Sequence, residues 1–182
     1  MDHSQERPDY DVADSLVVKE PERQRALAHE LRNKILGLLR ERALSISQLA
    51  EKLAVPKGTV GHHVKVLEDA ELVRVVRTRR VRAVTEKFYG RTARLFIVKG
   101  DEDPEATVSL AQLSLREAAE EISRSWDSTE TRQSLLHVRL TQADARRFRK
   151  RLDRLVDDFT AHEAKDGDMY GFVTGFYPMP DE

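Results

Sequence analysis

Apolar residues recur at helical spacing three times between residues 21 and 72. The first run predicts one helix from Pro21 to about Arg42, because a proline suits the first turn of a helix and the apolar positions fall on a single stripe. The stripe consists of Leu27, Leu31, Ile35, Leu38 and Leu39. Residues 1–20 have no sustained apolar period, and we expect a flexible acidic segment there, in which Val12, Leu16, Val17 and Val18 could at most dock a short stretch.

Two shorter helices are predicted next. The first begins at Ser45-Ile46-Ser47-Gln48, which has the form of a capping box, and its apolar face consists of Leu49, Ala50 and Leu53. Pro56 and Gly58 interrupt this pattern before the other helix begins. The apolar residues Val60, Val64 and Leu67 share one face of that helix, which predicts that this face is buried.

The spacing of apolar residues changes to two after Leu72, which predicts β-structure. Val73–Val76 and Val81–Val84 are the predicted strands, and the basic stretch Arg77–Arg80 between them is the predicted turn. Three helices followed by such a hairpin describe a winged helix-turn-helix, which we place at residues 21–100. Residues 101–105 form a charged, proline-containing break and the predicted domain boundary.

The pattern of residues 101–182 predicts helix, strand, helix and strand in that order. The first helix carries apolar positions from Ala111 to Trp126, and the second opens at Thr141 with Phe148 and Phe159 facing inward. The strands are predicted at residues 136–140 and 170–177. The fold class is therefore α+β, an N-terminal winged helix-turn-helix followed by a small α/β C-terminal region for dimerisation or effector binding. Because two strands alone rarely make a stable sheet, we expect the C-terminal regions of two chains to pack together.

Charge is segregated along the chain, although the net charge of the whole is −1. Residues 1–22 hold two basic and seven acidic residues, and residues 101–182 hold 11 basic and 18 acidic residues. Residues 23–100, in contrast, hold 18 basic and seven acidic residues. The excess of positive charge in the middle segment indicates an anionic partner, and nucleic acid is the first candidate.

Composition excludes several classes of protein. The chain has no cysteine, which rules out disulfides, thiolate metal sites, iron–sulfur clusters and cysteine nucleophiles. It has no run of about 18 apolar residues and no signal-peptide pattern at its start, so we expect no membrane span and a cytoplasmic location. We find neither a glycine-rich phosphate loop nor a catalytic spacing, so we expect no enzyme and no cofactor.

The face of the third predicted helix opposite its apolar stripe carries small and hydrogen-bonding residues. Gly58, His62, Lys65 and Asp69 lie on this face, and Thr59 and His63 flank it. A helix fits the major groove of DNA, where base edges are read by hydrogen bonds, and His62 is the first candidate for such a contact. Lys57, Lys65 and Ser47 are candidates for phosphate contacts. A surface position without DNA contact is the alternative for the histidines, and His63 could instead support the helix.

The predicted hairpin is strongly basic. It contains five arginines within nine positions, with no acidic residue between them: Arg74, Arg77, Arg79, Arg80 and Arg82. The expected partner is phosphate, and Arg79 and Arg80 at the predicted tip could pair with phosphates or enter a narrow minor groove. A solvated face without a partner is the alternative.

Residues 31–89 resemble the arsenic-repressor (ArsR) type of bacterial transcription regulator, in the stretches LAEKL, TVGHHVKVL and ELV. The resemblance implies that the TVGHH helix enters the major groove of double-stranded DNA, that the wing runs beside it, and that the protein acts as a homodimer, which we expect to be a repressor. The chain departs from the family pattern at Gly58 and Gly61, where serines are frequent, and at Glu71, where glycine is usual. A winged helix that contacts protein or RNA without operator binding is the alternative.

Two kinds of ligand site are considered for the C-terminal region. Oxygen and nitrogen ligands for a metal are present as His137, His162, Glu163, Asp166 and Asp168, but they show no recognised ligand spacing, and we expect no metal site. Five aromatic residues could line an apolar pocket for an unidentified small-molecule effector, with ordinary core or dimer contacts as the alternative: Trp126, Phe148, Tyr170, Phe172 and Phe176. The sequence names no effector.

Overall fold

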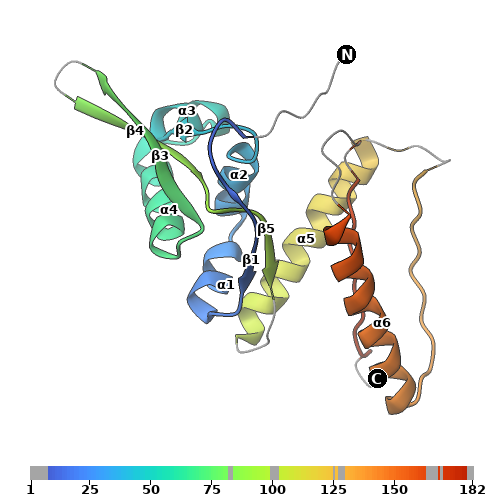
Figure 1. Ribbon diagram of the computed structural model, residues 1–182. Coiled ribbons are helices and arrows are strands. Elements are labelled where there is room, and N and C mark those ends of the chain that lie inside the picture. Colours follow the sequence, from blue (N-terminus) through green and yellow to red (C-terminus); the bar gives the residue numbers. More distant parts are fainter. Residues whose placement is uncertain are drawn as a thin grey trace. The chain divides into compact units, whose positions relative to one another are not determined.

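The structure is a computed structural model that describes residues 8–81, 84–98, 103–124, 126, 130–162, 168 and 170–179. It divides into two compact units, Met1–Ser114 and Leu115–Glu182, which are described separately. All of the strands in the described part of the chain belong to the first unit (Figure 1). In that part of the chain, no helix combines the length and the apolar composition that a membrane span needs.

Two helices, α1 (Pro21–Leu27) and α2 (Glu30–Leu38), replace the single helix predicted from residue 21 onward. The backbone is extended at His29, whose side chain caps α2 by accepting a hydrogen bond from its first turn. Arg32 and Asn33 of α2 donate hydrogen bonds to the carbonyl oxygens in the last turn of α1. The prediction was wrong because the break depends on these side-chain contacts, which satisfy the ends of both helices, and no proline or glycine marks it.

The next two helices agree with the prediction. In the turn before α3 (Ile46–Leu53), the Ser45 hydroxyl accepts a hydrogen bond from the N–H of Gln48, and the Gln48 side chain accepts one from the N–H of Ser45. The predicted capping box is therefore confirmed. Ala54 ends α3 in the left-handed conformation, with φ of 52°, and α4 (Lys57–Asp69) follows after a short turn.

The wing is an antiparallel hairpin of β3 (Val73–Val81) and β4 (Val84–Arg91), which extends away from the helices of its unit (Figure 1). The predicted strands were too short and the second was misplaced, because Arg77–Arg80, the predicted turn, lie on β3 itself. The pairing partners of β3 include Phe88 and Tyr89, which are buried on β4. These partners lie beyond the segment in which the prediction placed the whole hairpin, so the local pattern of residues 73–84 could not reveal them.

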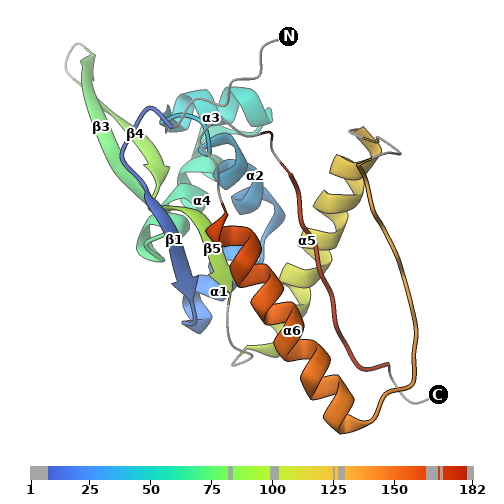
Figure 2. The same cartoon turned by 45° about the vertical axis from the view of Figure 1, so that its right-hand side comes forward.

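A second, two-stranded sheet is formed by β1 (Ala13–Val18) and β5 (Ala93–Val98), which run parallel beside each other (Figure 2). The expectation of a flexible segment at residues 1–20 was wrong for β1, and residues 1–7 lie outside the described residues. Val18 is completely buried at the end of β1. Parallel strands need partners that are distant in the sequence, which is why neither strand was recognised from its own short pattern.

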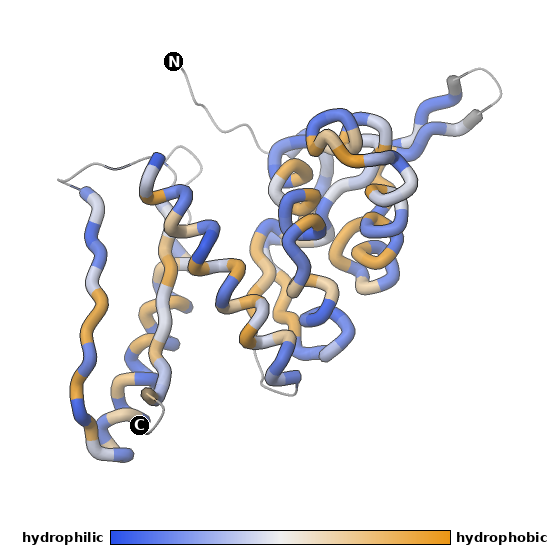
Figure 3. The backbone as a smooth tube through the Cα atoms, turned by 180° about the vertical axis from the view of Figure 1, so that it is seen from behind, coloured by the Kyte–Doolittle hydropathy of each residue, from blue (hydrophilic) through white to orange (hydrophobic). Residues whose placement is uncertain are grey.

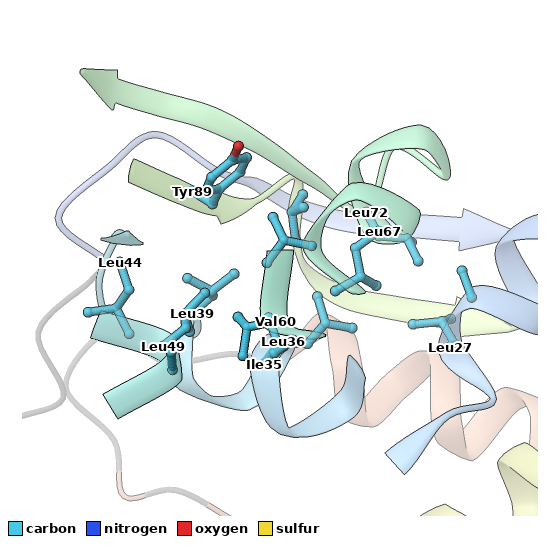
Figure 4. Close-up of a cluster of buried hydrophobic side chains, with 14 of the residues drawn as sticks. Leu27, Ile35, Leu36, Leu39, Leu44, Leu49, Val60, Leu67, Leu72 and Tyr89 are labelled. Carbon is cyan, nitrogen blue, oxygen red and sulfur yellow. The ribbon is translucent and has the colours of Figure 1, made fainter. Parts of the chain in front are cut away.

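One cluster of apolar side chains joins the elements of the first unit. β2 (Leu44–Ser45) pairs with β4 and completes a three-stranded sheet in the order β2-β4-β3. Side chains from α1 to α4 meet this sheet, as Figure 4 shows for residues that include Leu27, Ile35, Leu36, Leu39, Leu44, Leu49, Val60, Leu67, Leu72 and Tyr89. The core therefore fixes the position of α4 relative to the wing.

The C-terminal region contains two long helices and irregular chain. α5 (Pro104–Arg124) begins within the predicted break and crosses the boundary between the units. α6 (Gln142–Ala161) begins where it was predicted, with the Thr141 hydroxyl accepting a hydrogen bond from the N–H of Asp144 at 3.1 Å. The strands predicted at residues 136–140 and 170–177 were wrong, because these stretches do not join a sheet. Alternating apolar residues make a strand only when a neighbouring strand is available.

Apolar side chains of the second unit are largely exposed. The orange stretches of the backbone tube in Figure 3 mark the hydrophobic positions along α6 and the chain before it. None of the residues of α6 is buried, and Leu136 in the segment before it is 80% exposed. The five aromatic residues considered for an effector pocket are each at least 40% exposed: Trp126, Phe148, Tyr170, Phe172 and Phe176. A single chain thus leaves them uncovered, so they form neither an enclosed pocket nor a core.

Candidate nucleic-acid interface

The core holds α4 by one side and leaves the opposite side open to solvent. Val60, Val64 and Leu67 are at most 1% exposed, which agrees with the predicted apolar stripe. Five of the residues predicted to contact DNA are exposed on the other side of this helix: Lys57, Gly58, Thr59, His62 and Lys65. Ser47 is also exposed, at the start of α3. The helix therefore presents a contiguous polar surface in a fixed orientation.

Lys65 is paired along this surface with an acidic neighbour. Its Nζ lies 2.6 Å from Oδ1 of Asp69, one helical turn further on, and both side chains are well exposed. The hydrogen bond to Asp69 raises the pKa of Lys65 above its ordinary value. Exposed pairs of this kind are weak, so a phosphate group can compete with Asp69 for the ammonium group.

His63 differs from His62 because it faces the protein. Its ring centroid lies 4.6 Å from that of His29, the residue that caps α2, and its Nδ1 is buried without a hydrogen-bond partner in the described part of the chain. Burial lowers the pKa of His63, and the nearby positive groups His29, Arg32 and His62 lower it further. The structure therefore places His63 at the contact between α4 and α2, which matches the supporting role considered for it and separates it from the open face.

Several basic residues of the wing lie on β3. Arg77, Arg79 and Arg80 are exposed, and the guanidinium carbons of Arg77 and Arg79 lie 4.8 and 5.6 Å from the ring centroid of Phe88. Arg79 forms an ion pair with Glu86 at 2.8 Å. Arg82 lies outside the described residues. Stacking on Phe88 orients two guanidinium groups while leaving their edges available for phosphate oxygens.

Comparison with known proteins adds an identification to this geometry. Residues 27–76 match the model of a family described as a helix-turn-helix domain, and this range covers α2, β2, α3, α4 and the start of β3. This segment is a helix-turn-helix domain. The match confirms the helix-turn-helix expected from the resemblance to ArsR-type regulators, and it supports the DNA-binding class that was predicted. With the hairpin of β3 and β4, the fold is a winged helix-turn-helix.

Several solved structures are similar to part of this chain. Reduced HlyU from Vibrio cholerae is 23% identical over 52% of this chain and 80% of its own, with a TM-score of 0.32. The homodimeric winged helix-turn-helix domain Mb0332 from Mycobacterium bovis, described as a possible ArsR-family regulator, is 16% identical over 59% and 82% of the two chains, with a TM-score of 0.35. The transcriptional repressor BigR from Xylella fastidiosa is 18% identical over 61% and 86%, with a TM-score of 0.32. No curated protein matches, and the domain assignment rests on the family model.

One acidic residue of the wing, which was not among the predicted site residues, links the wing to the helix-turn-helix domain. Glu86 on β4 accepts a hydrogen bond from Ser45 and pairs with Arg79, and these two contacts lower its pKa. It borders a shallow hollow of about 200 Å³ that also includes Ser47. Its place opposite Arg79 in the ladder follows from the register of β3 and β4, which was not predictable from local pattern. Glu86 therefore reduces the net positive charge of the wing around Arg79.

Three of the five residues considered as metal ligands in the C-terminal region belong to the described part of the chain. Glu163 and Asp166 lie outside the described residues, whereas His137, His162 and Asp168 lie within them. Across those described ranges, no group of three or more histidine and carboxylate side chains is placed to hold a metal ion. His162 instead contacts Asp158, one turn earlier at the end of α6.

Acidification is expected to destabilise the contact between α4 and α2. The pKa values of His29 and His63 are lowered in the folded protein, mainly by burial, so the unfolded chain takes up protons at a higher pH. Stability should therefore be constant above the ordinary histidine pKa and fall as the pH drops below about 6.5. Urea unfolding at several pH values measures this slope. His63→Gln should reduce the slope, His62→Gln on the open face should not, and equal slopes in all three proteins would contradict the role assigned to His63.

Proposed function

We propose that this chain is a homodimeric, sequence-specific regulator of transcription that binds double-stranded DNA, and that it acts as a repressor in the cytoplasm. The observation that carries the proposal is the open polar face of α4 in a helix-turn-helix domain, next to a wing whose β3 strand is basic. In this proposal α4 enters the major groove, where His62 contacts base edges. Lys57, Lys65 and Ser47 contact phosphates beside it.

The charge on the wing supports an anionic partner. Arg74, Arg77, Arg79 and Arg80 are all exposed on β3. Arginine can pair with phosphate through two parallel hydrogen bonds, and neutralised phosphates release counterions, which makes such binding sensitive to salt. The wing therefore supplies affinity for any duplex, whereas α4 supplies preference among sequences.

Dimerisation is assigned to the second unit. Its helix α6 exposes an apolar stripe that includes Phe148, Leu155 and Phe159, and the irregular segment before it exposes Leu136 and Val138. Exposed apolar side chains on this scale are typical of surfaces that another molecule covers. Two copies joined in this way would present two winged helices to half-sites about one helical turn apart, ~34–36 Å.

DNA binding is tested by titrating the full-length protein with duplexes at several salt concentrations, after enrichment of bound fragments from a random pool. The logarithm of the affinity should fall linearly with the logarithm of the salt concentration, with a slope of about −0.9 for each phosphate contact. Enrichment of one motif supports sequence-specific binding. Salt-insensitive binding, or no binding to any duplex, would contradict the proposal.

Two substitutions separate the roles of α4 and the wing. His62→Ala should flatten the preference among sequences by about 1–3 kcal/mol at the base pair that it contacts, because a base-edge hydrogen bond is lost. Arg80→Ala should weaken binding to all duplexes alike and make the salt slope about one unit shallower. Titration of the enriched duplex and a scrambled duplex with each variant distinguishes these outcomes. An equal loss on both duplexes for His62→Ala would count against base contact by that side chain.

A further inference from the structure

On the basis of the DNA-binding function above, we propose that the N-terminal strap, defined as Pro8–Asp11, is a built-in competitor of DNA for the arginines of the wing. In the free protein Asp9 forms an exposed ion pair with Arg77, and a DNA phosphate competes with its carboxylate for that guanidinium group. The strap therefore sets the strength of DNA binding from within the same chain.

Tyr10 anchors the strap to the first unit. Its hydroxyl accepts a hydrogen bond from the N–H of Arg91 at 3.0 Å and donates one to the carbonyl oxygen of Leu39. Its ring covers Gly90 so closely that a Cβ atom there would lie 2.6 Å from a ring carbon. Burial raises the pKa of Tyr10, so the hydroxyl keeps the proton that it donates. This anchor joins the end of α2 to the base of the wing.

The two residues that flank Tyr10 are directed at the wing by this anchor. Oδ1 of Asp9 accepts a hydrogen bond from the N–H of Ala43 at 2.6 Å, and its Oδ2 lies 3.5 Å from Nη1 of Arg77. On the other side, the carbonyl oxygen of Asp11 accepts a hydrogen bond from Nη2 of Arg74 at 2.7 Å. The strap thus places one carboxylate and one carbonyl oxygen on two arginines of β3. Phosphate oxygens accept the same hydrogen bonds from arginine, so a DNA phosphate would take the place of the carboxylate or of the carbonyl oxygen.

The contact with Arg77 is open enough to be exchanged. The side chain of Arg77 is 53% exposed and that of Asp9 is 44% exposed, so a phosphate can approach the same guanidinium group. Arg77 also rests on the ring of Phe88, which holds it in place without Asp9. An exposed ion pair is weak, so Asp9 tunes the availability of Arg77 and does not block it.

Asp9→Asn removes the negative charge of Asp9 and keeps the position of the strap, because an asparagine Oδ1 can still accept the hydrogen bond from the N–H of Ala43. The full-length variant should bind duplex DNA about two- to fivefold more tightly at low salt, which corresponds to the usual strength of an exposed ion pair. Its salt slope should be steeper by up to about 0.9, because one more phosphate is neutralised. Asp11→Asn is the matched control, since it removes the same charge two residues away while leaving the backbone contact to Arg74.

Three possible outcomes of the DNA titrations decide whether Asp9 competes with DNA for Arg77. Tighter binding by Asp9→Asn than by Asp11→Asn, abolished when Arg77 is replaced by alanine, supports the competitor role. Equal effects of the two substitutions, or weaker binding by Asp9→Asn, would overturn the competitor role. Neither result would contradict DNA binding by the wild-type protein. Failure of the wild-type protein to bind any duplex would overturn both the competitor role and the proposed function. Thermal unfolding of each variant establishes that the anchor at Tyr10 is intact.

Discussion

Leu67→Ala is expected to lower the free energy of unfolding by about 2–5 kcal/mol, the usual cost of truncating a buried leucine. Leu67 is completely buried on α4, where it contributes to the cluster that holds the helix against the sheet. The substitution leaves a cavity at the base of the candidate DNA-contacting helix, whose neighbours can collapse only in part. Urea unfolding followed by circular dichroism, at one fixed protein concentration, measures the loss.

Leu95→Ala provides the control for this measurement. Leu95 lies on β5 in the same unit and is 40% exposed, so the same change of side chain should cost about 1 kcal/mol or less. Similar losses for the two variants would show that burial on α4 does not hold the unit together. A stable Leu67→Ala protein with unchanged DNA affinity would contradict the dependence of the site on this packing.

Replacing both Phe148 and Leu155 by aspartate is expected to separate the proposed homodimer and to reduce the affinity for a two-half-site duplex by about 100-fold or more, because linked binding events add their effects. Both side chains are exposed on the apolar stripe of α6. In the proposed dimer these positions are covered by the second copy, and two unpaired carboxylates there would be costly to bury. Sedimentation and DNA titration of the same sample measure the two effects together.

Gln142→Asp is the matched control for the dimer experiment. It adds a carboxylate to the exposed first turn of α6, where negative charge is favourable to a helix. This variant should remain a dimer and bind DNA normally. A wild-type protein that sediments as a monomer at micromolar concentration, or a double variant with Phe148→Asp and Leu155→Asp that stays dimeric, would contradict the assignment of the second unit to dimerisation.

Local signals predicted the helices that form the candidate interface. The capping box at Ser45 and Gln48 satisfies backbone groups within one turn of helix, so its sequence spacing is sufficient to locate the start of α3. The stripe on α4 is likewise a property of one helix. Glu71 takes the left-handed conformation, with φ of 56°, at the position where the resembling family usually has glycine. Glycine adopts this conformation without steric cost, whereas Glu71 adopts it with a side chain present.

Contacts that the hydrophobic pattern does not report account for the errors. The break between α1 and α2 depends on Arg32 and Asn33, and the length of the wing depends on residues of β4 that lie past the predicted hairpin. The parallel pair of β1 and β5 joins the N-terminal segment to a strand that follows the wing. The wing and the parallel pair are stabilised by partners that are distant in the sequence, and the break between the helices is stabilised by side-chain hydrogen bonds to the backbone six residues earlier. The hydrophobic period reports neither kind of contact.

The residues that face the core on α4 and the polar set opposite them follow from the amino-acid order alone, because one helical period decides which side chains share a face. The same order located the excess of positive charge in the middle of the chain. The tertiary structure decided which of those charges are free to act: Asp9 reaches Arg77, Glu86 reaches Arg79, and His63 is turned toward α2. The first contact depends on the docking of the N-terminal strap, the second on the register of β3 and β4, and the third on the packing of α4 beside the start of α2, and the period of a single element reports none of these.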